Sequence, residues 1–200
     1  CQTAFMGVDN KSAGELAGKQ IGDLFKSKYD CQYDAWVSLE ASKAGTLNQD
    51  RMGGYRSGFE SVCGAIHDER TLDVGGQADT ANTMMTDALT AMPGAKRIIV
   101  VSLNDAALEG ALAAAAAKHR IDDVVGSGQG LDSSGVCAMR QFPDQWLGDT
   151  AYFPEKFGPV AVDTIVKLVN GEQVPDKTPA DISWVTPETV GQLYPDVDCK

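Results

Sequence analysis

Short apolar runs alternate with stretches of helical composition along most of the chain, and this alternation limits the possible folds. Runs typical of buried strands occupy residues 4–8, 35–39, 71–74, 97–103, 123–125 and 148–153. Helices are expected at residues 12–26, 51–64, 79–91, 105–118, 134–141 and 154–170. Strands begin about every 25 to 35 residues, the length of one β-α unit. We therefore predict an α/β fold: a doubly wound, mostly parallel sheet with helices on both faces.

Local signals set the expected helix ends and the domain boundary. Ser12-Ala-Gly-Glu15 has the Ser-x-x-Glu capping pattern, so a helix is expected to begin at Ser12. Pro154 suits the first turn of a later helix, and Asn170-Gly171 suits its end. Prolines interrupt the chain beyond that point. We expect one α/β lobe over residues 1–170 and an extended crossover tail over residues 171–200.

The charge balance narrows the classes of partner. The chain has 17 Lys and Arg against 28 Asp and Glu, a formal net charge of −11. Nucleic acids and anionic membranes favour clustered cations, so neither is expected as the main partner. The longest apolar run, residues 112–117, is far too short to span a membrane. With 43% apolar and 22% charged residues, the composition is that of a soluble folded domain.

The five cysteines are widely spaced and lack the C-x-x-C spacing of zinc sites. They are either buried thiols or the disulfides of an exported protein with one thiol left over. Cys31 precedes a predicted strand and Cys63 ends the helix after it, so Cys31–Cys63 is the favoured pair. Cys1 and Cys199 form a second candidate pair, which requires the chain ends to meet.

Polar side chains follow the predicted strands, at the edge where ligands bind in open parallel sheets. This predicted rim comprises Asn10, Arg51, Gln77, Asn104, Asp105, Gln129 and Tyr152. Planar amide, carboxylate and guanidinium groups bridge vicinal hydroxyls, and an aromatic ring covers the C–H face of a sugar. The rim therefore suits a polyhydroxylated ligand. Alternatively, these side chains only cap helices, as short polar residues usually do: Asp9, Asn10, Asp79, Asn104 and Asp105. Capping is the favoured role for the three aspartates.

Several motifs, in order over most of the chain, resemble type I periplasmic sugar-binding proteins, the ribose-binding-like solute receptors of ABC importers. The motifs are Phe5-Met-Gly-Val-Asp-Asn10, Arg51-Met-Gly-Gly-Tyr55, Leu89-Thr-Ala-Met-Pro93, Ser102-Leu-Asn-Asp105, Val124-Val-Gly126 and Tyr152-Phe-Pro-Glu-Lys-Phe-Gly158. The resemblance implies a receptor whose two lobes close on a sugar. Only the second lobe is largely present, so we interpret the chain as a C-terminal-lobe fragment.

The resemblance also implies roles for single residues. Arg51 and Asn104 match the family's Arg and Asn that contact sugar hydroxyls, so ligand contact is the favoured role for Asn104. Gly128 stands where the family usually has Asp, with Gln129 beside it. Gly76 and Gln77 lie where ribose-binding relatives have an aromatic residue after the third strand, and Tyr152 lies where they often have Gln. These departures argue against ribose itself and leave the sugar open.

The resemblance implies a sugar- or polyol-binding subunit of an ABC import system, without catalysis or cofactor. Its expected partners are the ligand and the membrane permease subunits, and its expected location is outside the cytoplasm. The surface left by a missing lobe would also allow a homodimer.

Two other classes of function fit the sequence less well. The first is an enzyme that uses Ser127 or Cys137 as a nucleophile, which would need a histidine base beside it. His67 and His119 are expected at the edge of the sheet opposite the rim, so neither nucleophile has such a base. A dinucleotide loop would need Gly rather than Leu131 after Gly126 and Gly128, and the carboxylates are too scattered to predict a metal site. The effector domain of a lactose-repressor-type regulator shares the implied fold. Such a regulator would carry a basic helix-turn-helix, which is absent from this sequence.

Overall fold

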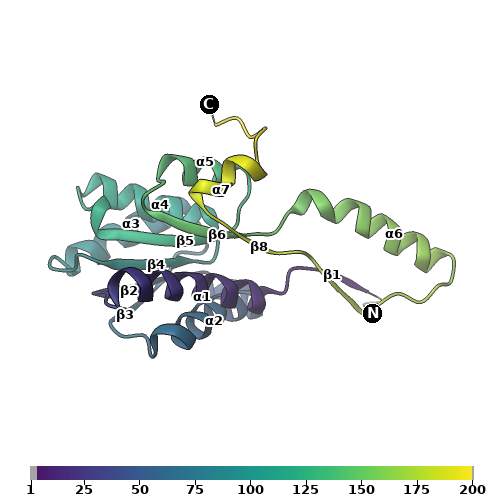
Figure 1. Ribbon diagram of the computed structural model, residues 1–200, viewed down its shortest axis with the longest axis horizontal. Helices are drawn as coiled ribbons and strands as arrows, with labels where there is room; N and C mark the ends of the chain where they lie inside the picture. The colour runs from purple at the N-terminus through teal and green to yellow at the C-terminus, as the bar shows by residue number, and fades with distance from the viewer. Residues whose placement is uncertain (1–3, 200) are drawn as a thin grey trace.

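A central sheet organises the protein, whose computed structural model describes residues 4–199 (Figure 1). The strand order is β3-β2-β4-β5-β6-β8, parallel throughout except for the antiparallel edge strand β8. The strands are β2 (Ala35–Glu40), β3 (Glu69–Asp73), β4 (Ile98–Ser102), β5 (Val124–Gly130), β6 (Trp146–Ala151) and β8 (Ser183–Val185). The predicted mostly parallel sheet is therefore confirmed.

Helices cover both faces of this sheet. One face carries α1 (Asn10–Tyr29) and α2 (Thr46–Cys63). The other carries α3 (Ala78–Ala91), α4 (Asp105–Ala117), α5 (Ser133–Gln141) and α7 (Pro187–Leu193). Alternate residues of a strand point to opposite faces, so Ile98 and Val100 of β4 enter one core while Ile99 and Val101 enter the other. Short 3₁₀ turns lie at Ser42–Ala44 and Ile121–Asp123.

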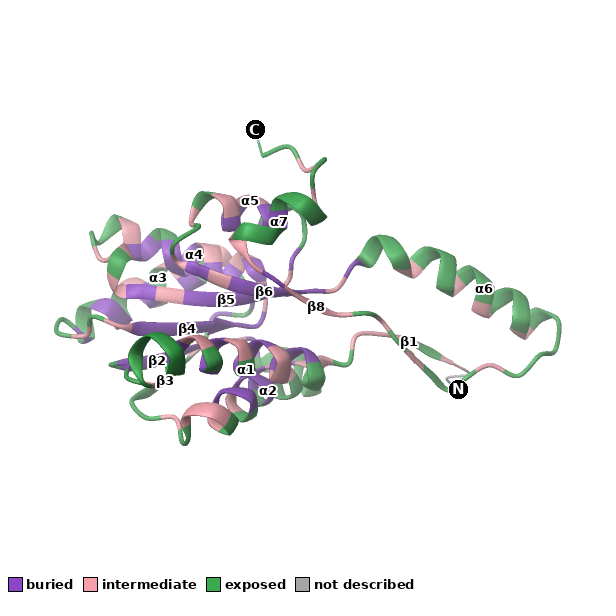
Figure 2. Ribbon diagram, in the orientation of Figure 1, coloured by how far each residue is buried: buried purple, intermediate pink, exposed green. Residues whose placement is uncertain are grey.

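An arm projects from the carboxyl end of the sheet (Figures 1 and 2). We define the arm as β1 (Phe5–Gly7), the 3₁₀ turn Pro154–Lys156, α6 (Phe157–Val169) and β7 (Lys177–Pro179). The prediction that residues 4–8 join the main sheet is wrong, because β1 pairs in parallel with β7 in a separate two-stranded sheet. No residue of α6 is buried.

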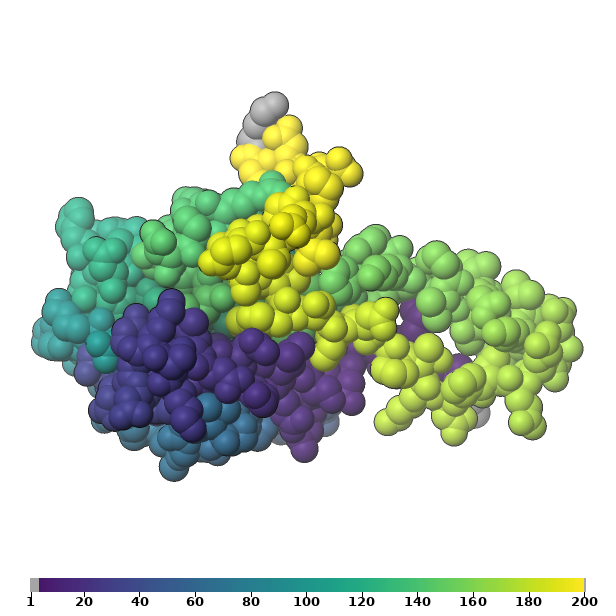
Figure 3. Space-filling view, in the orientation of Figure 1, coloured from purple at the N-terminus to yellow at the C-terminus, as the bar shows by residue number. Residues whose placement is uncertain are grey.

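The C-terminal tail folds back onto the lobe, which differs from the extended segment predicted from residue 171. In Figure 3 the tail runs from the arm onto the main body. There β8 pairs with β6, and Val185 and Val190 are buried in the core. Prolines break the tail into short pieces, yet Pro187 sits in the first turn of α7, where a missing N–H costs nothing. The lobe therefore includes residues on both sides of the predicted boundary.

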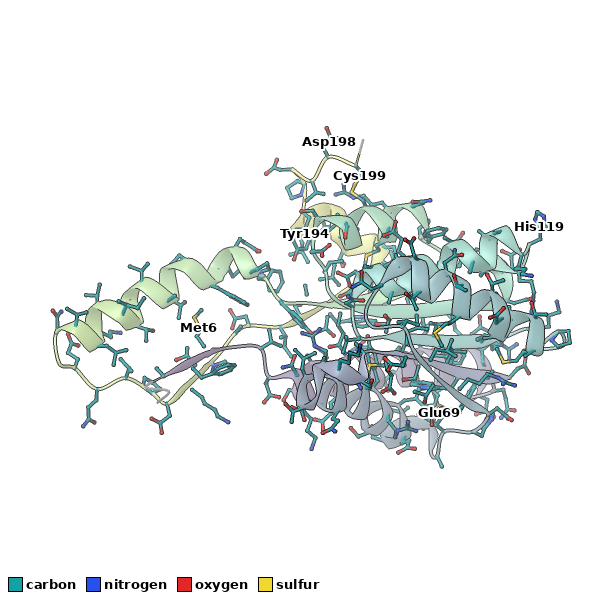
Figure 4. All side chains as sticks on the ribbon, turned by 180° about the vertical axis from the view of Figure 1, so that it is seen from behind. Met6, Glu69, His119, Tyr194, Asp198 and Cys199 are labelled. Carbon is teal, nitrogen blue, oxygen red and sulfur yellow. A yellow bond between two sulfur atoms is a disulfide. The ribbon has the colours of Figure 1, made fainter. Side chains whose placement is uncertain are left out.

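Two disulfides join cysteines within residues 4–199. The predicted Cys31–Cys63 bond is confirmed and joins α1's end to α2's end. The second prediction is wrong for Cys199, which bonds to Cys137 of α5, while Cys1 lies outside the described residues. Arg140 explains this partner, because its guanidinium donates to the carbonyls of Tyr194 (2.7 Å) and Val197 (2.8 Å) and holds the tail against α5. Figure 4 shows Tyr194 and Cys199 together at this end of the chain.

Helix α1 begins earlier than predicted. Asp9 is the N-cap and accepts the N–H of Ser12 at 3.0 Å, so Ser12 lies within the first turn rather than at the cap. The capping role predicted for Asp9 is therefore confirmed. Among residues 4–199, no helix combines the length and apolarity needed to cross a bilayer.

Candidate functional site

Arg51 lies at the centre of the candidate site, at the carboxyl edge of the sheet. It occupies the second turn of α2 and is half-buried. Its Nε donates to Oδ1 of Asn10 at 2.8 Å, and its Nη1 donates to the carbonyl of Leu103 at 2.9 Å. Since Asn10 begins α1 and Leu103 follows β4, the guanidinium ties three elements together at one edge. No carboxylate of the described chain forms an ion pair with it.

Tyr152 extends this group toward β5. The guanidinium of Arg51 lies 5.0 Å from the centre of the Tyr152 ring, a cation–π arrangement. The Tyr152 hydroxyl donates to Oε1 of Gln129 at 2.6 Å. Burial raises the pKa of Tyr152 well above its usual value, against a lowering by Arg51, so the hydroxyl stays protonated and remains a donor. Asn10, Arg51, Tyr152 and Gln129 therefore form one connected network.

Gln129 is more deeply placed than predicted. It lies within β5 rather than in a loop after it, and only 2% of its surface is exposed. Its Nε2 donor has no partner among the described residues. A buried amide donor without a partner is unfavourable, so this group is available to a ligand oxygen or a water molecule.

Asn104 and Gln77 lie next to this network. Asn104 caps α4, accepting the N–H of Ala107 at 3.1 Å, and its Nδ2 donates to the carbonyl of Gly76 at 3.0 Å. Gln77 follows Gly76 and is exposed. Because Leu103, the neighbour of Asn104, accepts from Arg51, Arg51 and Asn104 lie at the same edge of the sheet. Their contact with a ligand stays a prediction.

Asp105 is the exception among the predicted rim residues. Its side chain turns into the lobe: the residue is 3% exposed, and Oδ2 accepts the N–H of Asp132 at 3.1 Å. The first position of α4 points its side chain toward β5 and α5, whose Gly128 and Gly135 leave room for it. We therefore correct its placement from the rim to the interior.

Sequence reasoning missed two residues beneath the rim. Tyr55 of α2 is fully buried, and its hydroxyl donates to the carbonyl of Gly128 at 2.7 Å. Asp149 of β6 is also fully buried. A charged residue in the middle of a predicted buried strand was the available signal for Asp149.

A hollow beside Tyr152 opens toward the arm. It is lined by residues of the arm and its connections: Met6, Tyr152, Phe153, Lys156, Phe157, Val160, Thr178, Pro179, Ala180 and Asp181. Figure 4 shows Met6 in the arm and His119 at the far end of the molecule. The placement of His119 opposite the rim is thus confirmed, and the candidate site lies where arm and lobe join.

A mostly parallel sheet with helices on both faces, and with polar side chains at its carboxyl edge, is typical of the α/β lobe of a ligand-binding protein. A sequence model described as "Periplasmic binding protein domain" matches residues 1–173, so the chain belongs to this family. The resemblance stated from the sequence motifs is therefore confirmed at the level of the family. No curated protein matches the chain.

Solved structures agree with this assignment. The chain is similar to an ABC transporter periplasmic solute binding protein from Actinobacillus succinogenes 130z with bound D-allose, with a TM-score of 0.80, 20% identity, and coverage of 94% of this chain and 63% of that one. It is also similar to a solute binding protein from Bacillus halodurans C-125 with bound myo-inositol, with a TM-score of 0.79 and 21% identity. That match covers 96% of this chain and 63% of the other. A third similar structure is a solute binding protein from Mycobacterium smegmatis with bound glycerol, with a TM-score of 0.76 and 26% identity. That match covers 96% of this chain and 63% of the other. The chain thus spans less than two thirds of these proteins' length.

Proposed function

We propose that this protein binds a sugar or polyol as part of the solute receptor of an ABC importer, and that it does so without catalysis. The observation that carries the proposal is the Asn10–Arg51–Tyr152–Gln129 network, which gathers hydrogen-bonding groups and an aromatic face at one edge of the sheet. Such groups match the vicinal hydroxyls and C–H faces of carbohydrates. The neighbouring proteins with bound allose and inositol support this ligand class.

Ligand contact would act on a conformational equilibrium. We infer that Arg51, Asn104, Gln129, Tyr152, Asn10 and Gln77 contact the ligand. In a two-lobed receptor, contacts made only in the closed state favour closure. Membrane permease subunits would then recognise the closed form. We place the protein outside the cytoplasm, and its two disulfides support an oxidising compartment.

The test is binding of defined sugars and polyols. D-Allose, D-arabinose, myo-inositol and glycerol are screened by thermal shift, and hits are measured by calorimetry. We expect Arg51→Ala to weaken the affinity for a hit at least about tenfold, because it removes a charged donor from a half-buried site. NMR of the recovered ligand is expected to show it chemically unchanged.

Arg56→Ala is the matched control. Arg56 lies on the same helix, but its guanidinium pairs with Glu69, outside the network. This variant should bind with wild-type affinity. The proposal fails if none of these polyhydroxylated compounds binds, or if Arg51→Ala and Arg56→Ala have equal effects.

A further inference from the structure

Two buried carboxyl groups lie directly beneath the candidate site. Asp105 is 3% exposed and Asp149 is fully buried. Asp149 stands opposite Gly128 in the β5–β6 register, and Asp105 begins α4. A methyl group placed on Gly128 would lie 2.6 Å from Oδ1 of Asp105 and 2.7 Å from Oδ2 of Asp149. The two carboxyl groups therefore converge on the space that this glycine leaves open.

Neither carboxyl group has a cationic partner. Within residues 4–199, no Lys, Arg or His forms an ion pair with Asp105 or Asp149. Among the described residues, Oδ1 of Asp105 and both oxygens of Asp149 have no hydrogen-bond partner. The indole N–H of Trp146 and the backbone N–H of Gly130 are near enough to lower the pKa of Asp149, but by less than burial and Asp105 raise it. Two ionised carboxylates can only accept hydrogen bonds and repel each other. A proton on one converts this contact into a hydrogen bond to the other.

The surroundings favour that proton. Burial raises the pKa of Asp149 well above its usual value, and the neighbouring Asp105 raises it further. Burial also raises the pKa of Asp105, partly offset by the hydrogen bond from Asp149. The titratable groups that act on the pair, or on which the pair acts, are acidic or phenolic: Asp132, Tyr55, Tyr152 and Tyr194. None supplies a positive charge.

The pair is connected to the turn that follows Gln129. Oδ2 of Asp105 accepts the N–H of Asp132, the N-cap residue of α5. Between Gln129 and Asp132, Gly130 and Leu131 have positive φ values of 123° and 53°. A non-glycine residue held in the left-handed region needs support from its surroundings. The Asp105–Asp132 bond provides such support.

We propose that Asp105 and Asp149 share one proton at neutral pH, and that the protonated pair is a positioning device for the turn at residues 130–132 and for Gln129 at the candidate site. Its relevance to ligand binding rests on the proposed function, but the proton-sharing itself does not. Loss of the proton would place two negative charges side by side and draw Asp105 away from Asp132. The turn would then loosen.

The test measures two quantities as a function of pH, in the absence of ligand: the melting temperature and the hydrogen exchange of the Asp132 amide. The folded state binds this proton more tightly than the unfolded state, so stability is lost as pH rises from the ordinary carboxyl range through the raised folded pKa. We expect Asp149→Asn, whose amide can donate to Asp105, to melt at least about 3 °C above wild type at pH 8, with a smaller difference at pH 5. Protection of the Asp132 amide against hydrogen exchange, corrected for the intrinsic exchange rate, should fall as the pH rises in wild type but not in Asp149→Asn.

Further variants keep the test decisive. Asp105→Asn can still accept from Asp132 and should also remove the pH dependence of that amide's protection. Asp87→Asn, at an exposed site on α3, should keep the wild-type profile. Carboxyl ¹³C NMR should show one of the pair titrating above the ordinary range. Ordinary titration of both, or parallel pH profiles for wild type and Asp149→Asn, would overturn the proposal. Failure of every sugar to bind would refute only the proposed function.

Discussion

At the scale of single residues, the Tyr152–Gln129 hydrogen bond is the contact most open to a direct measurement. Tyr152→Phe keeps the ring under Arg51 but removes the hydroxyl that donates to Oε1 of Gln129. Since Gln129 is buried, its amide would lose its only described side-chain partner, and we expect a loss of about 1–3 kcal/mol in the free energy of unfolding. Urea denaturation measures this loss.

A double-mutant cycle provides the control for that prediction. Gln129→Met replaces the amide by an apolar side chain of similar length, so nothing is left unsatisfied when Tyr152→Phe is added. The double variant should be more stable than the sum of the single effects allows. Strict additivity would show that the two side chains do not depend on each other.

Single-residue roles were predictable where local chemistry decides them. Asp9 caps α1, as predicted from its place before the helix. Asn104 also caps α4, a role that the sequence offered but that was not the favoured one. The partner of Cys199 was not predictable, because it depends on α7 and Arg140 bringing the tail onto α5. Likewise, the inward turn of Asp105 depends on two glycines distant in the sequence, Gly128 and Gly135.

At the scale of elements, the close packing of α1 against α2 depends on glycines that face each other. A Cβ on Gly18 would overlap the carbonyl of Tyr55 on α2, where the backbone cannot yield. We expect Gly18→Ala to lower the free energy of unfolding by about 1–3 kcal/mol or more. For a chain of this size, each kcal/mol corresponds to about 2–4 °C in melting temperature.

Gly53 provides the matched control on α2. It is exposed, and a Cβ there would meet nothing within 4 Å. Gly53→Ala should therefore raise stability by about 0.5–1 kcal/mol, because alanine favours the helix more than glycine does. If Gly18→Ala raised the melting temperature as Gly53→Ala is expected to, helix propensity rather than helix contact would govern this layer.

The periodicity of the sequence predicted the sheet and its helices well, because buried parallel strands read as continuous apolar runs. It misplaced β1, since a three-residue strand carries no mark of which sheet it joins. The end of β5 was also missed, because Gly-Ser-Gly-Gln-Gly lacks β-forming side chains, although pairing with β6 extends the strand through Gly130.

At the scale of the whole molecule, α6 in the arm is largely exposed (Figure 2), and one of its exposed faces is apolar. Val162, Ile165, Val166 and Val169 lie at helical spacing on that face, and Val169 is 81% exposed. The opposite face, with Phe157 and Val160, lines the hollow beside β7. Contiguous apolar surface of this kind marks an interaction site in a water-soluble protein.

We therefore expect the 200-residue chain, studied by itself, to associate with a second copy through α6. Sedimentation velocity should show a dimer that forms with rising concentration. Val166→Glu combined with Val169→Glu should shift the protein to monomer, because two buried charges without partners would oppose the contact. Leu193→Glu, at an exposed leucine on α7 (48% exposed), is the control and should leave association unchanged. A wild-type chain that stays monomeric at all concentrations would contradict the prediction, and an equal effect of Leu193→Glu would move the contact from α6 to the tail.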